Sequence, residues 1–221
     1  MGGSREMRDG MMLETLVDWT LNGVSQAPLL CSGQDEEALL TGHLITFGLV
    51  DSAKDILSVA RCENNWQVCA ALSPEAKKSV PGRLDKMEIN RSGRTVKAAE
   101  LNRLCDELMA LDHSAGLHSV LLCDGKKTVI GRDVGRHNAL DKAVGKALKE
   151  GIALDQAVLC SSGRLSLEMF AKAAFAGIPI LATRKQVGSL CAAYADRLDI
   201  AVCRVGKELQ CFSAPWRVIQ E

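Results

Sequence analysis

Residues 131–142 read GRDVGRHNALDK, and they follow two apolar runs, residues 120–123 and 128–130, that an Asp-Gly turn separates. This pattern predicts a β-hairpin that leads into a helix beginning near Asn138. The two glycines allow a ligand to approach the backbone closely, and the first N–H groups of the helix point toward the same loop. The stretch therefore predicts a binding site for an anion.

Arg132, Arg136 and His137 bring positive or proton-carrying groups to this predicted site. Because Arg136 disfavours the protonated imidazole that a general acid requires, its position beside His137 suits phosphate binding better than proton transfer. A purely structural interpretation also stays open. In it, Asp133 pairs with an arginine, and Asp133 or Asn138 caps the helix.

The length and charge of the chain limit the classes of function. With 221 residues, the chain can hold one large core, or a main domain with a small appended one. Lysine plus arginine equals aspartate plus glutamate, at 27 each, so there is no general basic field for nucleic acid or a membrane surface. No apolar run is long enough to span a bilayer. We therefore expect neither nucleic acid nor a membrane as a partner.

The cysteine pattern indicates a reduced environment. Nine cysteines occur without an N-terminal apolar signal segment and without Cys-x-x-Cys spacing. We therefore expect a cytoplasmic protein with free thiols. Cys123, Cys160 and Cys203 stand in apolar runs, where a cysteine usually acts as a small core residue.

The first part of the chain predicts short strands around one helix. Apolar alternation predicts a strand over residues 13–21 and a return strand over residues 24–30, and Ser32 with Asp35 resembles a capping box for the next helix. A second predicted hairpin joins the strands at residues 56–59 and 66–72.

A long basic segment separates these strands from a clear amphipathic helix. Residues 73–93 contain prolines, glycines and five lysines or arginines, and predict a solvated connecting loop. Residues 97–111 place leucines on one stripe of a helix, which predicts that this stripe faces a core.

The second half alternates strand and helix. Strands are predicted at residues 158–161, 179–183 and 200–204, and helices at residues 166–176 and 189–198. Such crossovers need a mostly parallel sheet with helices on its faces. Open α/β sheets bind ligands at the edge where their strands end. The side chains expected to rim a pocket there are Arg136, His137, Ser162, Arg164 and Arg184.

Three segments together resemble a known family: residues 131–148, residues 161–183, and residues 42–56 with LNGV before them. They resemble the formate dehydrogenase accessory proteins, the FdhD or NarQ family, and the resemblance covers most of the chain from about Glu14 onward. It implies an α/β three-layer sandwich similar to the cytidine deaminase fold. In that fold, residues 95–221 would form the main domain and residues 1–94 a small β-rich subdomain with its loop.

Members of that family are cytoplasmic sulfur carriers that associate as homodimers. They take persulfide sulfur from a cysteine desulfurase and pass it to the molybdenum cofactor in its bis(guanine dinucleotide) form, before the cofactor enters formate dehydrogenase. The resemblance thus implies that cofactor as the bound ligand, with GDP as an analogue. It implies cysteine desulfurase and formate dehydrogenase as partners.

The resemblance also points to particular residues. The central motif is matched by Asp133, Gly135, Arg136, His137 and Asp141, a second motif by Gly163, Arg164, Ser166 and Glu168, and His118 matches a histidine that follows paired glycines in the family. Residues 202–207 correspond to a segment that contacts the guanine dinucleotide, with Val202 where an aromatic residue is usual. The implied cofactor-binding residues are Asp133, Gly135, Arg136, His137, Ser162, Arg164, Val202, Cys203, Arg204, Gly206 and Lys207.

One departure concerns the family's persulfide site. Members carry Cys-Gly-x-Cys-Gly between the second hairpin and the amphipathic helix, whereas residues 78–82 read KSVPG here. Because only a thiolate accepts sulfane sulfur in this way, the sequence identifies no catalytic residue. We interpret Cys62 and Cys69 as core residues and expect no site-selective persulfide.

Three functions therefore compete. The first is a sulfurtransferase that uses another cysteine, and the second is a cofactor-binding chaperone or regulator that has lost sulfur transfer. The third is a zinc hydrolase like the deaminases, which need His-x-Glu and Pro-Cys-x-x-Cys. The chain contains neither motif, so the sequence predicts no metal site.

Overall fold

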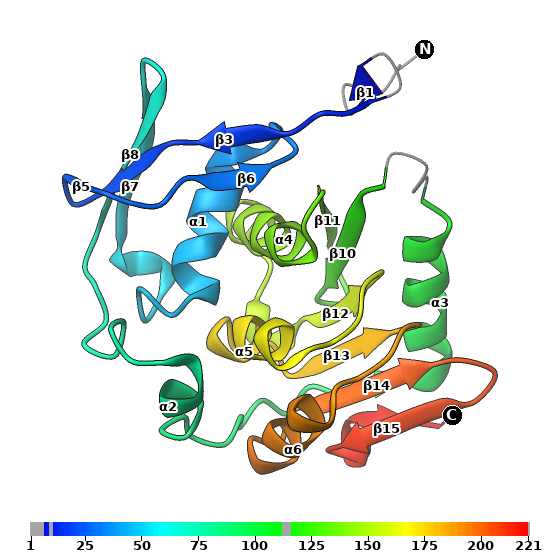
Figure 1. The fold of residues 1–221 in the computed structure, drawn as a ribbon. Coiled ribbons are helices and arrows are strands. Elements are labelled where there is room, and N and C mark those ends of the chain that lie inside the picture. Colours follow the sequence, from blue (N-terminus) through cyan, green and yellow to red (C-terminus); the bar gives the residue numbers. More distant parts are fainter. Residues whose placement is uncertain (1–6, 9–10, 112–115, 221) are drawn as a thin grey trace.

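The computed structural model describes residues 7–8, 11–111 and 116–220, and a six-stranded sheet lies at the centre of this part (Figure 1). The sheet has the order β11-β10-β12-β13-β14-β15, with strands β10 (His118–Cys123), β11 (Thr128–Asp133), β12 (Val158–Ser161), β13 (Ile180–Thr183), β14 (Ala201–Val205) and β15 (Leu209–Ser213). The helices are α1 (Glu36–Thr46), α2 (Val80–Leu84), α3 (Ala98–Met109), α4 (Arg136–Glu150), α5 (Leu167–Phe175) and α6 (Ser189–Arg197). None of the helices in these ranges has both the length and the apolar character that crossing a membrane requires.

Alternate side chains of the sheet enter two separate cores. Cys160 and Cys203 pack with the leucines of α3 on one face, whereas Leu159 and Val202 pack with α4, α5 and α6 on the other. Figure 1 shows α3 on one side of the sheet and α4, α5 and α6 on the opposite side. The predicted three-layer α/β fold is therefore confirmed.

The sheet is mixed, which corrects the prediction of a mostly parallel one. Only β12, β13 and β14 run parallel, and their register aligns Ser161 with Thr183 and Thr183 with Arg204. The pairs β10–β11, β10–β12 and β14–β15 are antiparallel. The crossovers through α5 and α6 require parallel neighbours, whereas a hairpin on each side adds antiparallel strands. Strand β15 was not predicted.

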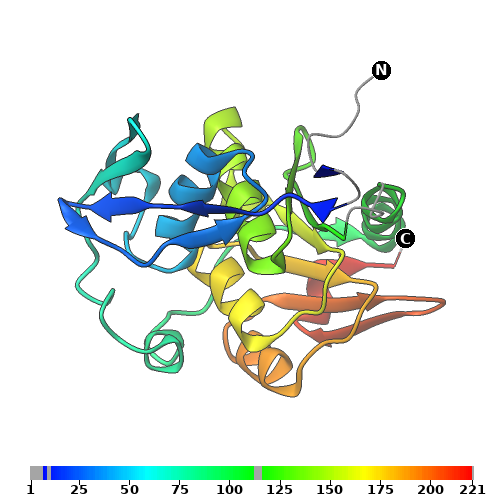
Figure 2. The ribbon, with the colours of Figure 1, turned by 45° about the horizontal axis from the view of Figure 1, so that its top comes forward.

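Helix α1 crosses α4 at two glycines, and Figure 2 shows the two helices side by side. A Cβ on Gly42 would lie 1.8 Å from a backbone oxygen of α4, and a Cβ on Gly145 would lie 2.0 Å from a backbone oxygen of α1. Gly131 in β11 is equally close to α4, since its Cβ would lie 2.1 Å from a backbone oxygen. Gly131 therefore lets the helix approach the strand, and not a ligand as predicted.

Eight short strands of the described N-terminal part form three small sheets. They are β1 (Met7–Arg8), β2 (Met11–Met12), β3 (Thr15–Val17), β4 (Trp19–Leu21), β5 (Val24–Ser25), β6 (Leu29–Cys31), β7 (Ile56–Cys62) and β8 (Asn65–Ala70). The strand predicted at residues 13–21 and its return strand are each divided in two, while the predicted β7–β8 hairpin is confirmed. The core under α4 contains residues from both halves, including Leu44 and Leu140. The domain boundary after residue 94 stays a prediction.

The long segment at residues 73–93 is anchored, and is not the solvated connection that the sequence predicted. It contains α2, and the buried Arg83 side chain donates hydrogen bonds to the carbonyl oxygens of Phe47 and Gly48. These carbonyls follow the C-terminus of α1, where a cation is favourable. The guanidinium also lies 4.5 Å from the centre of the Phe175 ring.

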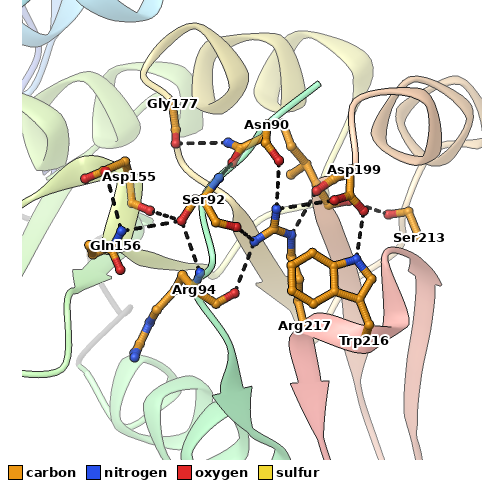
Figure 3. A network of polar contacts seen from close by, with 11 residues as sticks. Asn90, Ser92, Arg94, Asp155, Gln156, Gly177, Asp199, Ser213, Trp216 and Arg217 are labelled. Atoms are coloured by element: carbon orange, nitrogen blue, oxygen red, sulfur yellow. Dashed lines mark hydrogen bonds and ion pairs between the residues drawn. The ribbon is translucent and has the colours of Figure 1, made fainter. Parts of the chain in front are cut away.

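Arg217 holds the end of this segment and the C-terminal part of the chain together (Figure 3). Its fully buried guanidinium donates to the carbonyl oxygens of Asn90 at 3.0 Å, Ser92 at 2.7 Å and Asp199 at 2.8 Å. It also lies 4.3 Å from the centre of the Trp216 ring. One side chain therefore satisfies several backbone groups that no strand pairs. The short strands β9 (Val96–Lys97) and β16 (Val218–Ile219) pair beside it.

Candidate functional site

Asp133 ends β11 and is fully buried. Its Oδ2 lies 2.6 Å from Lys142 Nζ and accepts a hydrogen bond from the Ser32 backbone at 3.1 Å. Its Oδ1 accepts from the Gly135 backbone at 3.0 Å and from Asn138 Nδ2 at 3.2 Å. Lys142 is buried as completely as Asp133. Asp133 therefore shapes the loop before α4, and its charged partner is a lysine, not the arginine of the structural interpretation.

Ser32 belongs to this network and does not cap α1. Its hydroxyl accepts a hydrogen bond from Lys142 Nζ at 2.9 Å. The N-cap of α1 is Asp35, with φ 54° and no capping hydrogen bond from its side chain, and its carboxylate pairs with Lys146 at 2.6 Å. The predicted capping box is wrong, because the Ser32 hydroxyl instead forms hydrogen bonds with the buried Asp133–Lys142 pair.

Asp141 forms a second buried network that joins α1, α4 and α5. Lys172 Nζ lies 2.6 and 2.7 Å from its two carboxylate oxygens, Thr46 donates at 2.5 Å, and His43 Nδ1 lies at 3.1 Å. Burial alone would raise the pKa of Asp141, but Lys172 and His43 outweigh it and hold that pKa at about 2. Burial lowers the pKa of Lys172, although Asp141 opposes this.

His137 lies on the wall of a pocket of about 300 Å³, which we call the His137 pocket. The pocket combines aromatic and aliphatic walls with several basic groups, and is lined by Leu29, His43, Thr46, Phe47, Val80, Arg83, His137, Asn138, Glu168, Ala171, Lys172 and Phe175. Burial, then Arg136 and Lys172, lowers the pKa of His137, while Glu168 lies 3.3 Å from its Nε2. These effects favour the neutral imidazole, as the position of His137 beside Arg136 predicted.

Arg136 crosses the end of β12 at Gly163. A Cβ on Gly163 would lie 3.3 Å from Arg136 Cδ and 3.4 Å from His118 Nδ1, so a larger residue there would crowd both side chains. Arg136 Nε is buried and has no hydrogen-bond partner within the described part of the chain. Ser162 Oγ accepts from the Ser119 backbone at 2.8 Å, and Arg164 is exposed. Arg136 is therefore the cation at the start of α4 with donor capacity left for a ligand.

A second hollow of about 490 Å³, the Arg204 groove, lies where β13 and β14 end. It is lined by Arg184, Gln186, Arg204, Val205, Gly206, Lys207, Glu208 and Gln210. Arg204 donates to Gln186 at 3.2 Å and to Gln210 at 2.6 Å, and Arg184 pairs with Asp106. Three cations and a single carboxylate line the groove, so it favours an anionic ligand.

Only some of the predicted site residues lie at these two places. Arg136 meets Gly163 at the start of α4 and His137 lines the His137 pocket, whereas Arg184, Arg204, Gly206 and Lys207 line the groove. Both places lie at the edge where the three parallel strands end. Val202 and Cys203 are fully buried on opposite faces of the sheet, so only their backbone could reach a ligand.

Sequence reasoning missed Lys142 and Lys172, which compensate the two buried carboxylates. Each lysine could have been recognised by its position in an otherwise apolar helix segment, since it is followed directly by a core alanine, Ala143 or Ala173. A buried lysine requires a partner of opposite charge.

The interpretation of Cys62 and Cys69 as core residues is wrong, because both are exposed. They lie in the β7–β8 hairpin, most of whose side chains are exposed or only partly buried. All nine cysteines are free, and Cys31, Cys105, Cys123, Cys160, Cys191 and Cys203 are buried. Core positions were therefore predicted correctly for Cys123, Cys160 and Cys203.

The fold and the site define a class: a three-layer α/β protein with a basic groove at the edge where its parallel strands end. The sequence profile of the FdhD/NarQ family matches residues 12–219. This chain belongs to that family.

Relatives match along most of their length. The sulfur carrier protein FdhD of Mycolicibacterium paratuberculosis is 36% identical over 212 residues, which cover 77% of this chain and 76% of the relative. The Bacillus subtilis protein of the same name is 28% identical over 224 residues, with 90% and 86% covered. A crystal structure from Desulfotalea psychrophila, provisionally assigned as a formate dehydrogenase accessory protein, is 25% identical, covers 96% of each chain and superposes with a TM-score of 0.81.

Proposed function

We propose that this chain is a formate dehydrogenase accessory protein that binds the molybdenum cofactor in its bis(guanine dinucleotide) form. The observation that carries this proposal is the Arg204 groove, in which Arg184, Arg204 and Lys207 face Glu208 as the one lining carboxylate. Guanidinium groups bind phosphate oxygens through paired, charge-assisted hydrogen bonds. Arg136 and the N-terminus of α4 add a second basic surface at the same sheet edge.

Titration calorimetry with GDP tests the proposal. We expect binding by the wild-type chain, and we expect Arg204→Ala and Arg136→Ala each to weaken it by about 1–3 kcal/mol, as for a lost hydrogen bond to a charged group. Arg61→Ala is the matched control, because Arg61 is exposed on the β7–β8 hairpin. The proposal fails if millimolar GDP produces neither heat nor thermal stabilisation, since a ligand of the folded state must raise stability by mass action.

Sulfur transfer is the second part of the proposal: the chain would act in the cytoplasm on sulfur supplied by a cysteine desulfurase. The alternative, a cofactor-binding chaperone or regulator, is favoured by the absence of a cysteine near α2, where Ser79 instead caps the helix by accepting from Gly82 at 3.4 Å. Incubation with a cysteine desulfurase and cysteine, followed by peptide mass spectrometry, separates the two. A carrier acquires sulfur on one particular cysteine, and the alternative function leaves none modified selectively.

We also propose a homodimer, from the family resemblance and the apolar content of 47% with few aromatic residues. Light scattering at micromolar concentration should give the mass of two chains. A clean monomer would refute this part.

A further inference from the structure

Two cysteines face each other across the last two strands of the sheet. Cys203 in β14 and Cys211 in β15 are register partners in an antiparallel pair, and their Sγ atoms lie 3.2 Å apart. Residues directly opposite in such a pair have Cα atoms about 4.5 or 5.5 Å apart. A disulfide spans this separation. The two free thiols can therefore be joined with little movement of the strands.

The two thiols differ in access and in charge. Cys203 is fully buried, whereas Cys211 is half-buried in β15, which forms one end of the sheet. The hydrogen bond between them lowers the pKa of Cys211 to about 7, against the effect of partial burial, and the same contact together with burial raises the pKa of Cys203. Cys211 therefore presents a thiolate near neutral pH while Cys203 keeps its proton. The thiolate is the nucleophilic form.

We propose that Cys211 accepts sulfane sulfur from a persulfide donor and that Cys203 is the resolving thiol, an inference that rests on the sulfur-carrier function proposed above. In the first step, the Cys211 thiolate attacks the outer sulfur of a donor persulfide, R–S–SH. A bond forms between that sulfur and Cys211 Sγ, the S–S bond of the donor breaks, and the donor leaves as its thiolate, R–S⁻.

In the second step, Cys203 Sγ attacks Cys211 Sγ and displaces the outer sulfur as hydrosulfide. The Cys203 proton leaves with the hydrosulfide as it departs, so the products are a Cys203–Cys211 disulfide and hydrogen sulfide. The sulfane sulfur gains two electrons and is reduced, and the two thiols lose these electrons and are oxidised to the disulfide. A small dithiol reductant then restores the pair.

The other cysteines lack this combination of a neighbouring thiol and access. Cys62 lies opposite Asn65 and Cys69 opposite Ser58, so neither of these exposed residues has a cysteine across the hairpin. Cys105 and Cys160 have Sγ atoms 3.4 Å apart, but both are buried. The expectation of no site-selective persulfide, made from the sequence, depended on strand thiols being buried, and Cys211 departs from that condition.

The test uses the full chain, reduced and desalted, with glutathione persulfide as the donor at pH 7. Trypsin places Cys203 in the peptide 198–204, Cys211 in the peptide 208–217, and Cys62 with Cys69 in the peptide 62–77. In wild type we expect a disulfide between the first two peptides, with one hydrosulfide released for each disulfide. Because Cys203→Ala also removes the hydrogen bond that lowers the pKa of Cys211, this variant is assayed at pH 9 as well as at pH 7, and we expect a persulfide to accumulate on the peptide 208–217. Alanine is chosen because it adds no buried hydroxyl.

Two variants serve as controls. Cys211→Ser should give neither the disulfide nor the released hydrosulfide, and the double variant Cys62→Ser with Cys69→Ser should behave as wild type. Circular dichroism melting of each variant checks its folding. Labelling of the peptide 62–77 at or above the level of the peptide 208–217 would overturn the inference, and so would a Cys203→Ala protein that is folded but accumulates no persulfide.

The outcome can be separated from that of the proposed function, because the donor experiment involves no cofactor. GDP binding without labelling of Cys211 refutes the thiol pair and leaves cofactor binding standing. Labelled Cys211 without GDP binding refutes cofactor binding alone.

Discussion

Replacing Lys172 by methionine should change how the stability of the protein depends on pH. In the wild type, the pKa of the buried Asp141 is about 2, where the group would ordinarily have 3.8. A carboxyl whose pKa is lower in the folded state stabilises the fold above its unfolded pKa, here by about 2 kcal/mol. This contribution disappears as the pH falls from about 4 to 2.

The Lys172→Met variant keeps a long side chain but removes the charge that compensates Asp141. Thr46 and His43 still bond to the carboxylate. Removing one partner of a buried ion pair destabilises a protein by about 3–5 kcal/mol, because the remaining charge is buried without compensation. Burial should now raise the pKa of Asp141 above its unfolded value. The destabilisation is therefore complete at neutral pH and decreases as the pH falls through that raised pKa.

Urea unfolding followed by circular dichroism between pH 7 and pH 4 measures this effect. The quantity to compare is the free energy of unfolding of wild type minus that of the variant. In this difference the contributions of the other acidic groups cancel. We expect this difference to decrease toward pH 4. Lys126→Met, at an exposed lysine in the β10–β11 turn, should differ from wild type by less than about 0.5 kcal/mol at every pH. A difference for Lys172→Met that stays constant with pH would refute the assignment of Lys172 as the charge that compensates Asp141.

Three further outcomes are expected. Gly145→Ala should destabilise the fold by at least about 1–3 kcal/mol in thermal unfolding, because the added Cβ would lie 2.0 Å from a backbone oxygen of α1. An unchanged melting temperature would contradict the close contact of α1 and α4 at this glycine. Arg217→Met should lower the free energy of unfolding in urea by roughly 3 kcal/mol or more, because several buried carbonyls lose their donor. It should also speed hydrogen exchange in residues 90–94, and unaltered exchange there would contradict the role of Arg217 in holding this segment. The alkylation rate of Cys211 should fall below pH 7, approaching about tenfold per pH unit as the thiolate is protonated, and a flat profile down to pH 5 would contradict a pKa of about 7.

Local patterns in the sequence predicted much of the fold, while contacts distant in sequence determined what was missed. Two apolar runs around an Asp-Gly turn correctly predicted the β10–β11 hairpin, and the leucine stripe correctly predicted α3. Strand β15 was missed because its sequence, LQCFS, breaks apolar alternation at Phe212, and its position depends on pairing with β14. The exposure of Cys62 could not be predicted, since it depends on which face of its hairpin α1 covers.

The same limit applies to the site. The sequence indicated that Asp133 and Arg136 lie at one strand-to-helix connection, and in the structure they end β11 and begin α4. The partners of Asp133 come from Ser32, which is 101 positions away, and from a helix face whose orientation only packing decides. Likewise, the strand order that separates Arg136 from the Arg204 groove is a property of the whole sheet.

The crossing of α1 and α4 has a consequence for the newly made chain. Leu39, Leu40 and Leu44 of α1 are fully buried in the folded protein. The hydrogen bond from Ser32, just before this helix, to Asp133 can form only after a further 101 residues have been made. Closing a loop of that length costs about 4 kcal/mol of chain entropy. At a synthesis rate of about 5–20 residues per second, the delay is roughly 5–20 s. During that interval the face of α1 that packs on α4 stays uncovered, and it is accessible to chaperones and proteases.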